Sequence, residues 1–189
     1  MDKFVKYRRM KGMTLVELVA AMAIFGVILA AILTLFMTGL NFFKMGNNKS
    51  QAQSDARLAV NAIIENIKFA SEMQIMTSAA AQAAIASGSL SNFIFLDSGT
   101  GTMYLSEYNI STAAHINKRI ARTDQNYTLT FSKVDNKTLR ITVTVVESSE
   151  TYTVETELKL DNFVLNPALA ISGTESTAIM YKVKPPGGS

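Results

Sequence analysis

The chain has no cysteine, no tryptophan, one histidine and three prolines among its 189 residues. Without cysteine it has no disulfide framework, no thiol nucleophile and no cysteine-based zinc site. Its one histidine, His115, supplies too few ligands for a zinc site, and the sequence shows no serine and carboxylate arrangement that would complete a catalytic triad. We therefore expect no metal, no cofactor and no active site.

A net positive charge is confined to the N-terminal segment. The formal net charge is +3, but residues 1–12 hold five basic residues and one acidic residue, which leaves residues 13–189 with a net charge of −1. Lysine and arginine beside an apolar helix hold that end of the helix in the cytoplasm, so this segment predicts a membrane topology and not nucleic-acid binding. The basic residues are Lys3, Lys6, Arg8, Arg9 and Lys11.

A long apolar run follows the basic segment. Residues 13–40 read MTLVELVAAMAIFGVILAAILTLFMTGL, and Glu17 is the one charged residue among them. As a helix, residues 18–40 would extend about 35 Å, which exceeds the roughly 30 Å of a bilayer core. The apolar region of a secretory signal is shorter. We predict that this run is a membrane-spanning helix.

Helical spacing continues after Asn41, where the composition becomes polar. Apolar residues recur every three or four positions and polar residues take the opposite face, which predicts an amphipathic helix. The first proline is Pro167, so no proline interrupts the run, and we predict helix from residue 13 to about residue 75. The apolar stripe is Ala52, Ala56, Val60, Ile63, Ile67 and Ala70; the polar face carries Gln53, Arg57, Asn61, Glu65 and Lys68.

The C-terminal half changes to segments rich in β-branched and aromatic residues, which predict strands. Turn-prone residues at 135–137 and 147–150 join three of them into an antiparallel meander. In the last strand, alternate residues from Tyr152 to Leu160 form a face that we expect to pack on the amphipathic helix. The fold class is α+β, with one globular domain over residues 41–189. The predicted elements are a short helix or ordered loop at 76–92, strands at 93–96, 103–108, 127–133, 138–146 and 152–160, an edge strand at 178–183 and a flexible tail at 184–189.

The segment with the clearest functional pattern is Lys11-Gly12-Met13-Thr14-Leu15-Val16-Glu17, directly before the apolar run. It resembles the class III signal of type IV prepilins and type II secretion pseudopilins. That family has a short basic leader ending in glycine, then a hydrophobic residue, Thr-Leu, and glutamate at the fifth mature position. The resemblance implies that a prepilin peptidase cuts between Gly12 and Met13 and methylates the Met13 amine. Methionine replaces the family's usual phenylalanine at that position.

Glu17 needs a partner because an ionised carboxylate inside the membrane entrance costs about 2.5 to 3.5 kcal/mol. After cleavage, the new amine of Met13 is a cation at nearly the same depth. The resemblance implies that Glu17 of one subunit neutralises this amine on its neighbour, which would set the axial register of a filament. The same resemblance places Leu18, Phe25, Gly26 and Leu29 on the helix of the filament core. Thr34 stands where pilins often have proline, which favours a minor pilin or a pseudopilin.

Three other patterns in the sequence give weaker functional signals. His115 is expected on the surface or in a loop, and Gly99-Thr100-Gly101 is expected to be a turn because the longer phosphate-loop pattern is missing. Asp97, Glu107 and Asp124 do not have the spacing of a known calcium loop.

We therefore expect a non-enzymatic filament subunit of a type IV pilus, a competence pilus or a type II secretion pseudopilus. Its expected partners are other pilin or pseudopilin subunits, the prepilin peptidase, the membrane, and the inner-membrane assembly platform with its ATPase. The precursor would cross the cytoplasmic membrane once with its N-terminus inside, and the mature chain would lie in a cell-surface filament or a periplasmic or cell-wall pseudopilus. The alternatives are a membrane-anchored extracellular binding or sensor domain that keeps residues 1–12, and an anchored hydrolase.

Overall fold

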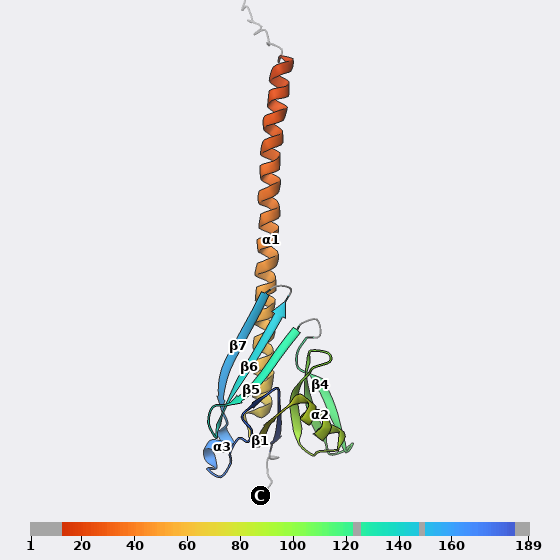
Figure 1. Cartoon of the computed structure of the whole chain (residues 1–189), viewed down its shortest axis with the longest axis vertical. Helices are drawn as coiled ribbons and strands as arrows, with labels where there is room; N and C mark the ends of the chain where they lie inside the picture. Colours follow the sequence, from red (N-terminus) through yellow and green to blue (C-terminus); the bar gives the residue numbers. More distant parts are fainter. Residues whose placement is uncertain (1–12, 123–125, 148–149, 184–189) are drawn as a thin grey trace, which may run out of the picture. The chain divides into compact units, whose positions relative to one another are not determined.

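The computed structural model describes residues 13–122, 126–147 and 150–183 (Figure 1). The predicted leader at 1–12 and the predicted tail at 184–189 lie outside the described residues. The chain divides into two compact units, the first ending at Lys44 and the second beginning at Met45. Each unit is described by itself below.

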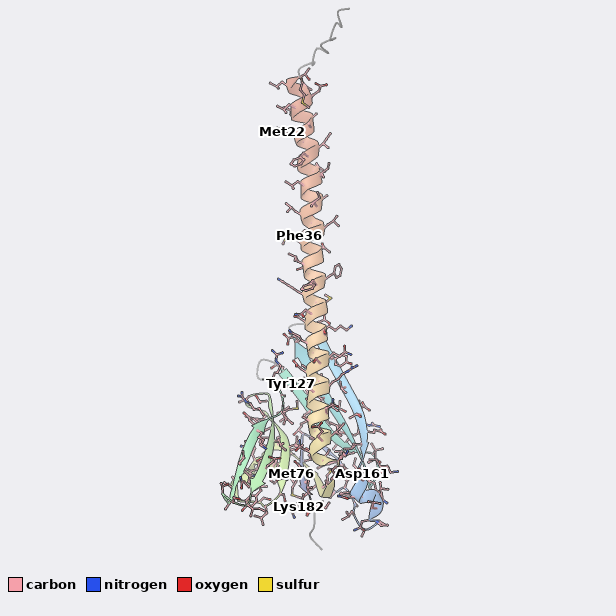
Figure 2. The ribbon with its side chains drawn as sticks, turned by 180° about the vertical axis from the view of Figure 1, so that it is seen from behind. Met22, Phe36, Met76, Tyr127, Asp161 and Lys182 are labelled. Carbon is pink, nitrogen blue, oxygen red and sulfur yellow. The ribbon has the colours of Figure 1, made fainter. Side chains whose placement is uncertain are left out.

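The first unit consists of the N-terminal part of helix α1, which begins at Leu15 and ends at Ile67. Its apolar side chains are exposed on all sides, as Met22 and Phe36 illustrate in Figure 2. Within the described residues, α1 is the one helix long and apolar enough to cross a membrane. The hydroxyls of Thr34 and Thr38 each donate to the carbonyl four residues earlier, at 2.9 Å, so these side chains leave no unpaired polar group towards lipid.

The described residues of the second unit form the remainder of α1, two short helices and two antiparallel sheets. In the described residues one sheet has strand order β1-β9-β2-β3-β4 and the other has strand order β7-β6-β5-β8. The elements are β1 (Ala70–Met76), α2 (Ser78–Ala86), β2 (Asn92–Asp97), β3 (Thr102–Asn109), β4 (Ala114–Arg119), β5 (Asn126–Lys133), β6 (Thr138–Glu147), β7 (Glu150–Lys159), α3 (Asp161–Leu165), β8 (Glu175–Ser176) and β9 (Ala178–Val183).

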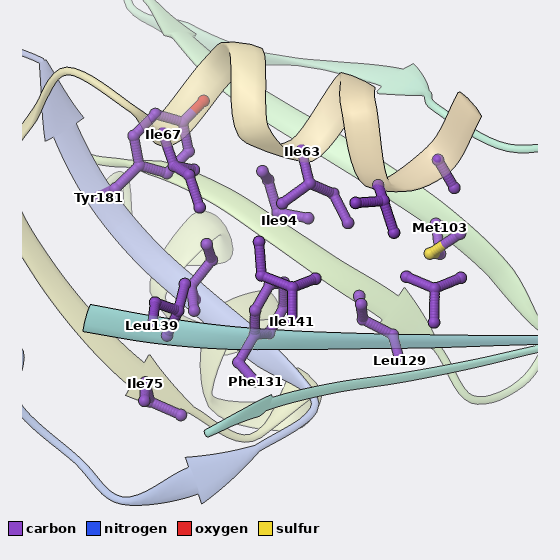
Figure 3. Packing of buried hydrophobic residues seen from close by; sticks show 14 of the residues in the cluster. Ile63, Ile67, Ile75, Ile94, Met103, Leu129, Phe131, Leu139, Ile141 and Tyr181 are labelled. Carbon is purple, nitrogen blue, oxygen red and sulfur yellow. The ribbon is translucent and has the colours of Figure 1, made fainter. Parts of the chain in front are cut away.

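One hydrophobic core joins α1 to both sheets. The predicted apolar stripe of the helix is confirmed, because Ala52, Ala56 and Ile63 are fully buried. Figure 3 shows Ile63 directed towards Ile94 of the first sheet and the side chains of the second sheet. A smaller cluster lies on the other face of the first sheet, where α2 packs. Sheet one is therefore covered on both faces, by α1 and by α2.

The predicted meander is confirmed as β5, β6 and β7, which pair in sequence with no register shift. Its first turn is held by Asp135, whose Oδ1 accepts from the backbone N–H of Lys137 at 2.6 Å and of Thr138 at 2.7 Å. These bonds, with one from the Thr138 hydroxyl, lower the pKa of the Asp135 carboxyl. The predicted packing face of β7 is half-buried and ends in the buried Leu160.

The helix prediction to about residue 75 is wrong at its C-terminal end. Helix α1 ends at Ile67, and Ala70–Met76 form strand β1. This strand pairs antiparallel with β9, and its side chains Ala70, Met73 and Ile75 are buried. Apolar spacing of three or four residues continues through Ala70, so the local pattern could not report the pairing with a strand more than 100 residues away.

Two further strand predictions are corrected. The segment at 178–183 is a strand, but it lies inside the first sheet between β1 and β2 and is not an edge. The edge strands of this sheet are β1 and β4, and the sequence did not predict β4 because AHINKR has few apolar residues and most of its side chains are exposed. The predicted short helix is confirmed as α2, with Thr77 as its N-cap.

Gly173 offers a test of the contact between β1 and the segment before β8. Its φ is +81°, and a Cβ there would lie 2.5 Å from the carbonyl oxygen of Ile75. We expect Gly173→Ala to lower the free energy of unfolding by about 2 to 5 kcal/mol, the sum of left-handed strain and overpacking. The measurement is denaturant unfolding of the purified chain in detergent.

Gly88 is the matched control, because its φ is +78° and no atom lies within 4 Å of its would-be Cβ. Gly88→Ala should lower the free energy of unfolding by only about 1 to 2 kcal/mol, the cost of placing a residue with a Cβ in the left-handed backbone conformation. Equal losses in the two variants would contradict a close approach at Gly173.

Candidate functional site

The N-terminal end of α1 is organised by a reciprocal pair of side-chain contacts. The Oε2 atom of Glu17 accepts from the Thr14 backbone N–H at 2.9 Å and from the Thr14 hydroxyl at 3.0 Å. In return, the backbone N–H of Glu17 donates to the Thr14 hydroxyl oxygen at 3.3 Å. This is a capping box, in which the residue before the helix and the third helical residue satisfy each other's free N–H groups.

The sequence favours this start for two reasons. The spacing Thr-x-x-Glu is that of a capping box, and a carboxylate in the first turn is attracted by the positive end of the helix dipole. The first intrahelical bond follows at once, from Leu18 N–H to the Thr14 carbonyl at 3.1 Å. The sequence analysis gives Thr14 no role of its own, although the Thr-x-x-Glu pattern of residues 14–17 is visible in the sequence.

The capping box leaves half of the Glu17 carboxylate available. Within residues 13–122, 126–147 and 150–183, no ion pair involves Glu17 and no hydrogen bond reaches its Oε1 atom. The carboxylate is thus oriented by its own chain through Oε2 and presents Oε1 to its surroundings. A single cationic donor from another molecule fits this arrangement.

The other predicted site residues lie along the same helix. Leu18, Phe25 and Leu29 are spaced by seven and four residues, so they share one face of α1, and all three are exposed. No atom lies within 4 Å of a would-be Cβ on Gly26. Met13 precedes the helix and is exposed, whereas Gly12 lies outside the described residues.

His115, expected on the surface or in a loop, lies on the edge strand β4 and not in a loop. It lies half-buried on β4, where Nε2 is 2.7 Å from the Ser89 carbonyl and Nδ1 is 3.0 Å from the Ser106 hydroxyl. Because a carbonyl only accepts, Nε2 donates to Ser89 and the hydroxyl of Ser106 donates to Nδ1. Ser106 is fully buried, and among the described residues both ring nitrogens contact serines and not a carboxylate. This serine and histidine pair lacks the geometry of a catalytic triad.

The acidic residues considered for calcium do not converge. Asp97 accepts from the Gly99 N–H at 3.1 Å and the Thr100 hydroxyl at 2.8 Å, and these bonds lower its pKa. Glu107 pairs with Lys118, and Asp124 lies outside the described residues. In the described part of the chain no group of three or more potential metal ligands gathers. Gly99–Gly101 is the predicted turn, between β2 and β3.

Comparison with known proteins gives a match to one family model and a fold match to two solved structures of one protein. Residues 7–39 match the prokaryotic N-terminal methylation motif. No curated protein matches the chain significantly. Among solved structures, the PilB minor pilin from Streptococcus sanguinis has 13% identity and a TM-score of 0.55, and a point mutant of it has 13% identity and a TM-score of 0.56.

Each of these alignments covers 74% of this chain and 36% of the solved one, so the chain spans about a third of the length of the proteins it matches. At this identity the likeness concerns the fold. It confirms the predicted α+β arrangement of a long N-terminal helix packed on antiparallel sheets. The motif independently covers the segment in which the capping box lies.

Proposed function

We propose that this chain, a type IV pilin-like protein by its motif and its fold, is a structural subunit of a type IV pilus, a competence pilus or a type II secretion pseudopilus. The observation that carries the proposal is the methylation motif at residues 7–39, continuous with a helix that can cross a membrane. Pilin-like proteins are structural subunits and not enzymes. The chemistry in this account is performed on the chain by other proteins.

The apolar helix lies in two apolar environments in succession, first the bilayer and then the filament core. In the precursor, residues 18–40 lie in the bilayer, and the basic leader keeps the N-terminus inside. After leader removal between Gly12 and Met13, the same side chains leave lipid for the core of a filament. Both environments are apolar, so the exposed face with Leu18, Phe25 and Leu29 remains covered in each. Gly26, with open space around it, gives a neighbouring helix room to approach.

Glu17 sets the register between subunits. The Oε2 atom is held by Thr14, and the Oε1 atom accepts from the amine of Met13 on the adjacent subunit. A subunit docked at the wrong height would leave both charges unpaired in an apolar environment, which is strongly unfavourable. Methylation of Met13 keeps the amine cationic. The pair therefore selects one axial position from the many that a smooth apolar helix would accept.

The proposal implies two kinds of partner besides other subunits. A membrane-embedded prepilin peptidase removes the leader and methylates Met13, and an assembly platform with its ATPase moves the subunit out of the membrane. The mature chain then lies in a filament at the cell surface or in a pseudopilus in the periplasm or cell wall. Support comes from the motif and from the length of the helix.

The test is to follow the chain in its native host with and without the prepilin peptidase. We expect the chain in the filament fraction that shearing releases from cells, and we expect it only in the membrane fraction when the peptidase is deleted. A membrane-anchored sensor domain would stay in the membrane fraction in both strains. That result would refute the proposal.

A further inference from the structure

Four triplets of the second unit have the acceptor pattern for a glycan on an asparagine amide. The pattern is asparagine, any residue except proline, then serine or threonine. It is short, so the surroundings of each triplet decide whether an enzyme could use it. The enzyme must reach all three residues and must find the amide and the hydroxyl free. The triplets are Asn48-Lys49-Ser50, Asn109-Ile110-Ser111, Asn126-Tyr127-Thr128 and Asn136-Lys137-Thr138.

Three of the triplets are held by the fold. Residues 48–50 lie inside helix α1, and residues 126–128 pair with β6 through a strand in which Tyr127 is buried. In the turn after β5, Thr138 donates to the Asp135 carboxylate through its N–H at 2.7 Å and through its hydroxyl at 3.0 Å. None of these segments could enter an active site without breaking a helix, a strand pairing or a turn.

The fourth triplet lies at the tip of the hairpin between β3 and β4. Asn109 is the last residue of β3, and Ile110 is 87% exposed. Ser111 is also exposed. Ala113 has a φ of +49°, a left-handed conformation that is rare outside glycine and that reverses the chain within a few residues. An enzyme can therefore approach this triplet from solvent without disturbing the sheet.

The groups that define the pattern are free at this hairpin. The Oδ1 atom of Asn109 accepts from the Ser111 N–H at 2.9 Å, which makes an Asx turn and holds the two residues side by side. In the part of the chain that the structure describes, no hydrogen bond involves the Nδ2 atom of Asn109 or the hydroxyl of Ser111. A single enzyme site could contact both groups together.

We propose that Asn109 is a glycosylation site that receives a saccharide from a lipid pyrophosphate carrier. The Nδ2 atom of Asn109 forms a bond to the anomeric carbon of the saccharide. The bond from that carbon to the pyrophosphate oxygen breaks, and its electron pair leaves with the lipid pyrophosphate. The amide nitrogen releases one proton, so the transfer needs no oxidant and no reductant. The attached saccharide covers Ile110, which the fold leaves exposed.

This inference goes beyond the proposed function. It requires that the second unit is exported, where an enzyme and a lipid-linked saccharide can meet the hairpin, but it does not require that the chain polymerises. An unmodified chain in filaments would remove the glycan and leave the subunit role standing. A modified chain that never enters filaments would remove the subunit role and leave the glycan.

The test is the mass of one peptide of the chain purified from membranes and filaments of its native host. Cleavage of the unfolded chain after Glu107 and Lys118 releases peptide 108–118, which contains one triplet. We expect a mass increase equal to one or more sugar residues, which fragmentation places on Asn109. An unmodified peptide in both fractions would overturn the inference. So would a sugar on Ser111 or Thr112, or a glycan on another triplet while Asn109 is unmodified.

Substitutions within the hairpin separate the pattern from the turn. Asn109→Gln should abolish the mass increase because it moves the amide away from the position that the pattern requires. Ser111→Ala should also abolish it, although the Asx turn persists because that turn uses the Ser111 backbone N–H. Ser111→Thr should retain the modification. Thr112→Ala is the matched control, since it removes a neighbouring hydroxyl outside the pattern. A sugar that survives Ser111→Ala would contradict the proposal.

Discussion

Replacing Glu17 by glutamine should reduce incorporation into filaments by about 100-fold while leaving leader removal intact. Glutamine keeps the acceptor that the capping box uses, so the helix start is preserved. What it removes is the negative charge opposite the Met13 amine of the neighbouring subunit. Removing one partner of a buried ion pair leaves the other charge unpaired and costs about 3 to 5 kcal/mol. A loss of 3 kcal/mol corresponds to roughly a factor of 100 in the assembly equilibrium. The measurement is the ratio of the chain in sheared filaments to the chain in membranes.

Thr14→Val is the complementary variant, because it removes the hydroxyl of the capping box and retains the charge of Glu17. Loss of an N-cap side chain costs about 1 kcal/mol, so we expect a reduction of about fivefold. If Thr14→Val and Glu17→Gln reduce incorporation equally, helix capping and not charge neutralisation explains the need for Glu17. If Glu17→Gln assembles normally, the pair does not set the register.

Replacing Gly12 by valine should leave the leader attached and keep the chain in the membrane. A close-fitting enzyme pocket discriminates even one added methylene-sized group by about tenfold, and valine adds three carbons beside the scissile bond. The uncleaved chain also has no free amine at Met13, so Glu17 of its neighbour has no partner. We expect a cleavage rate at least about tenfold lower, measured from the ratio of precursor to mature mass over time.

Gly12→Ala is the control, because it adds a single carbon at the same position. A small reduction of the cleavage rate in the alanine variant and a large reduction in the valine variant would agree with a cleavage site that admits only small side chains. Normal cleavage of the valine variant would place the processing site elsewhere. A cleaved valine variant that fails to assemble would point to a role for residue 12 outside processing.

The elements that the sequence predicted are those whose signal is local. The apolar run and the stripe through Ala52, Ala56 and Ile63 depend on spacing within a few turns, and both were found in the structure. The meander was equally visible, because its strands are consecutive and its turn at Asp135 has residues suited to reversal.

The missed elements depend on pairing across the chain. Strand β1 satisfies its backbone groups with β9, and β9 lies between β1 and β2, so neither position follows from its own residues. The apolar spacing at Ala70 fits a helix as well as a strand, and tertiary pairing decides between them. The division into two sheets follows from the same long-range contacts.

Part of the candidate site could be predicted from the sequence. The cleavage motif and Glu17 stand out because of their fixed spacing, and the capping role of Thr14 could have been read from Thr-x-x-Glu. The pocket that Phe69 and Leu165 line could not be predicted, because these two residues are almost 100 residues apart in the sequence. Only the fold brings them to one surface.

The most direct measurement is the mass of the N-terminal peptide of the chain recovered from sheared filaments of its native host. The account predicts a peptide that starts at Met13 and carries one methyl group. A filament-derived chain that still begins at Met1, or that begins at any residue other than Met13, would contradict it.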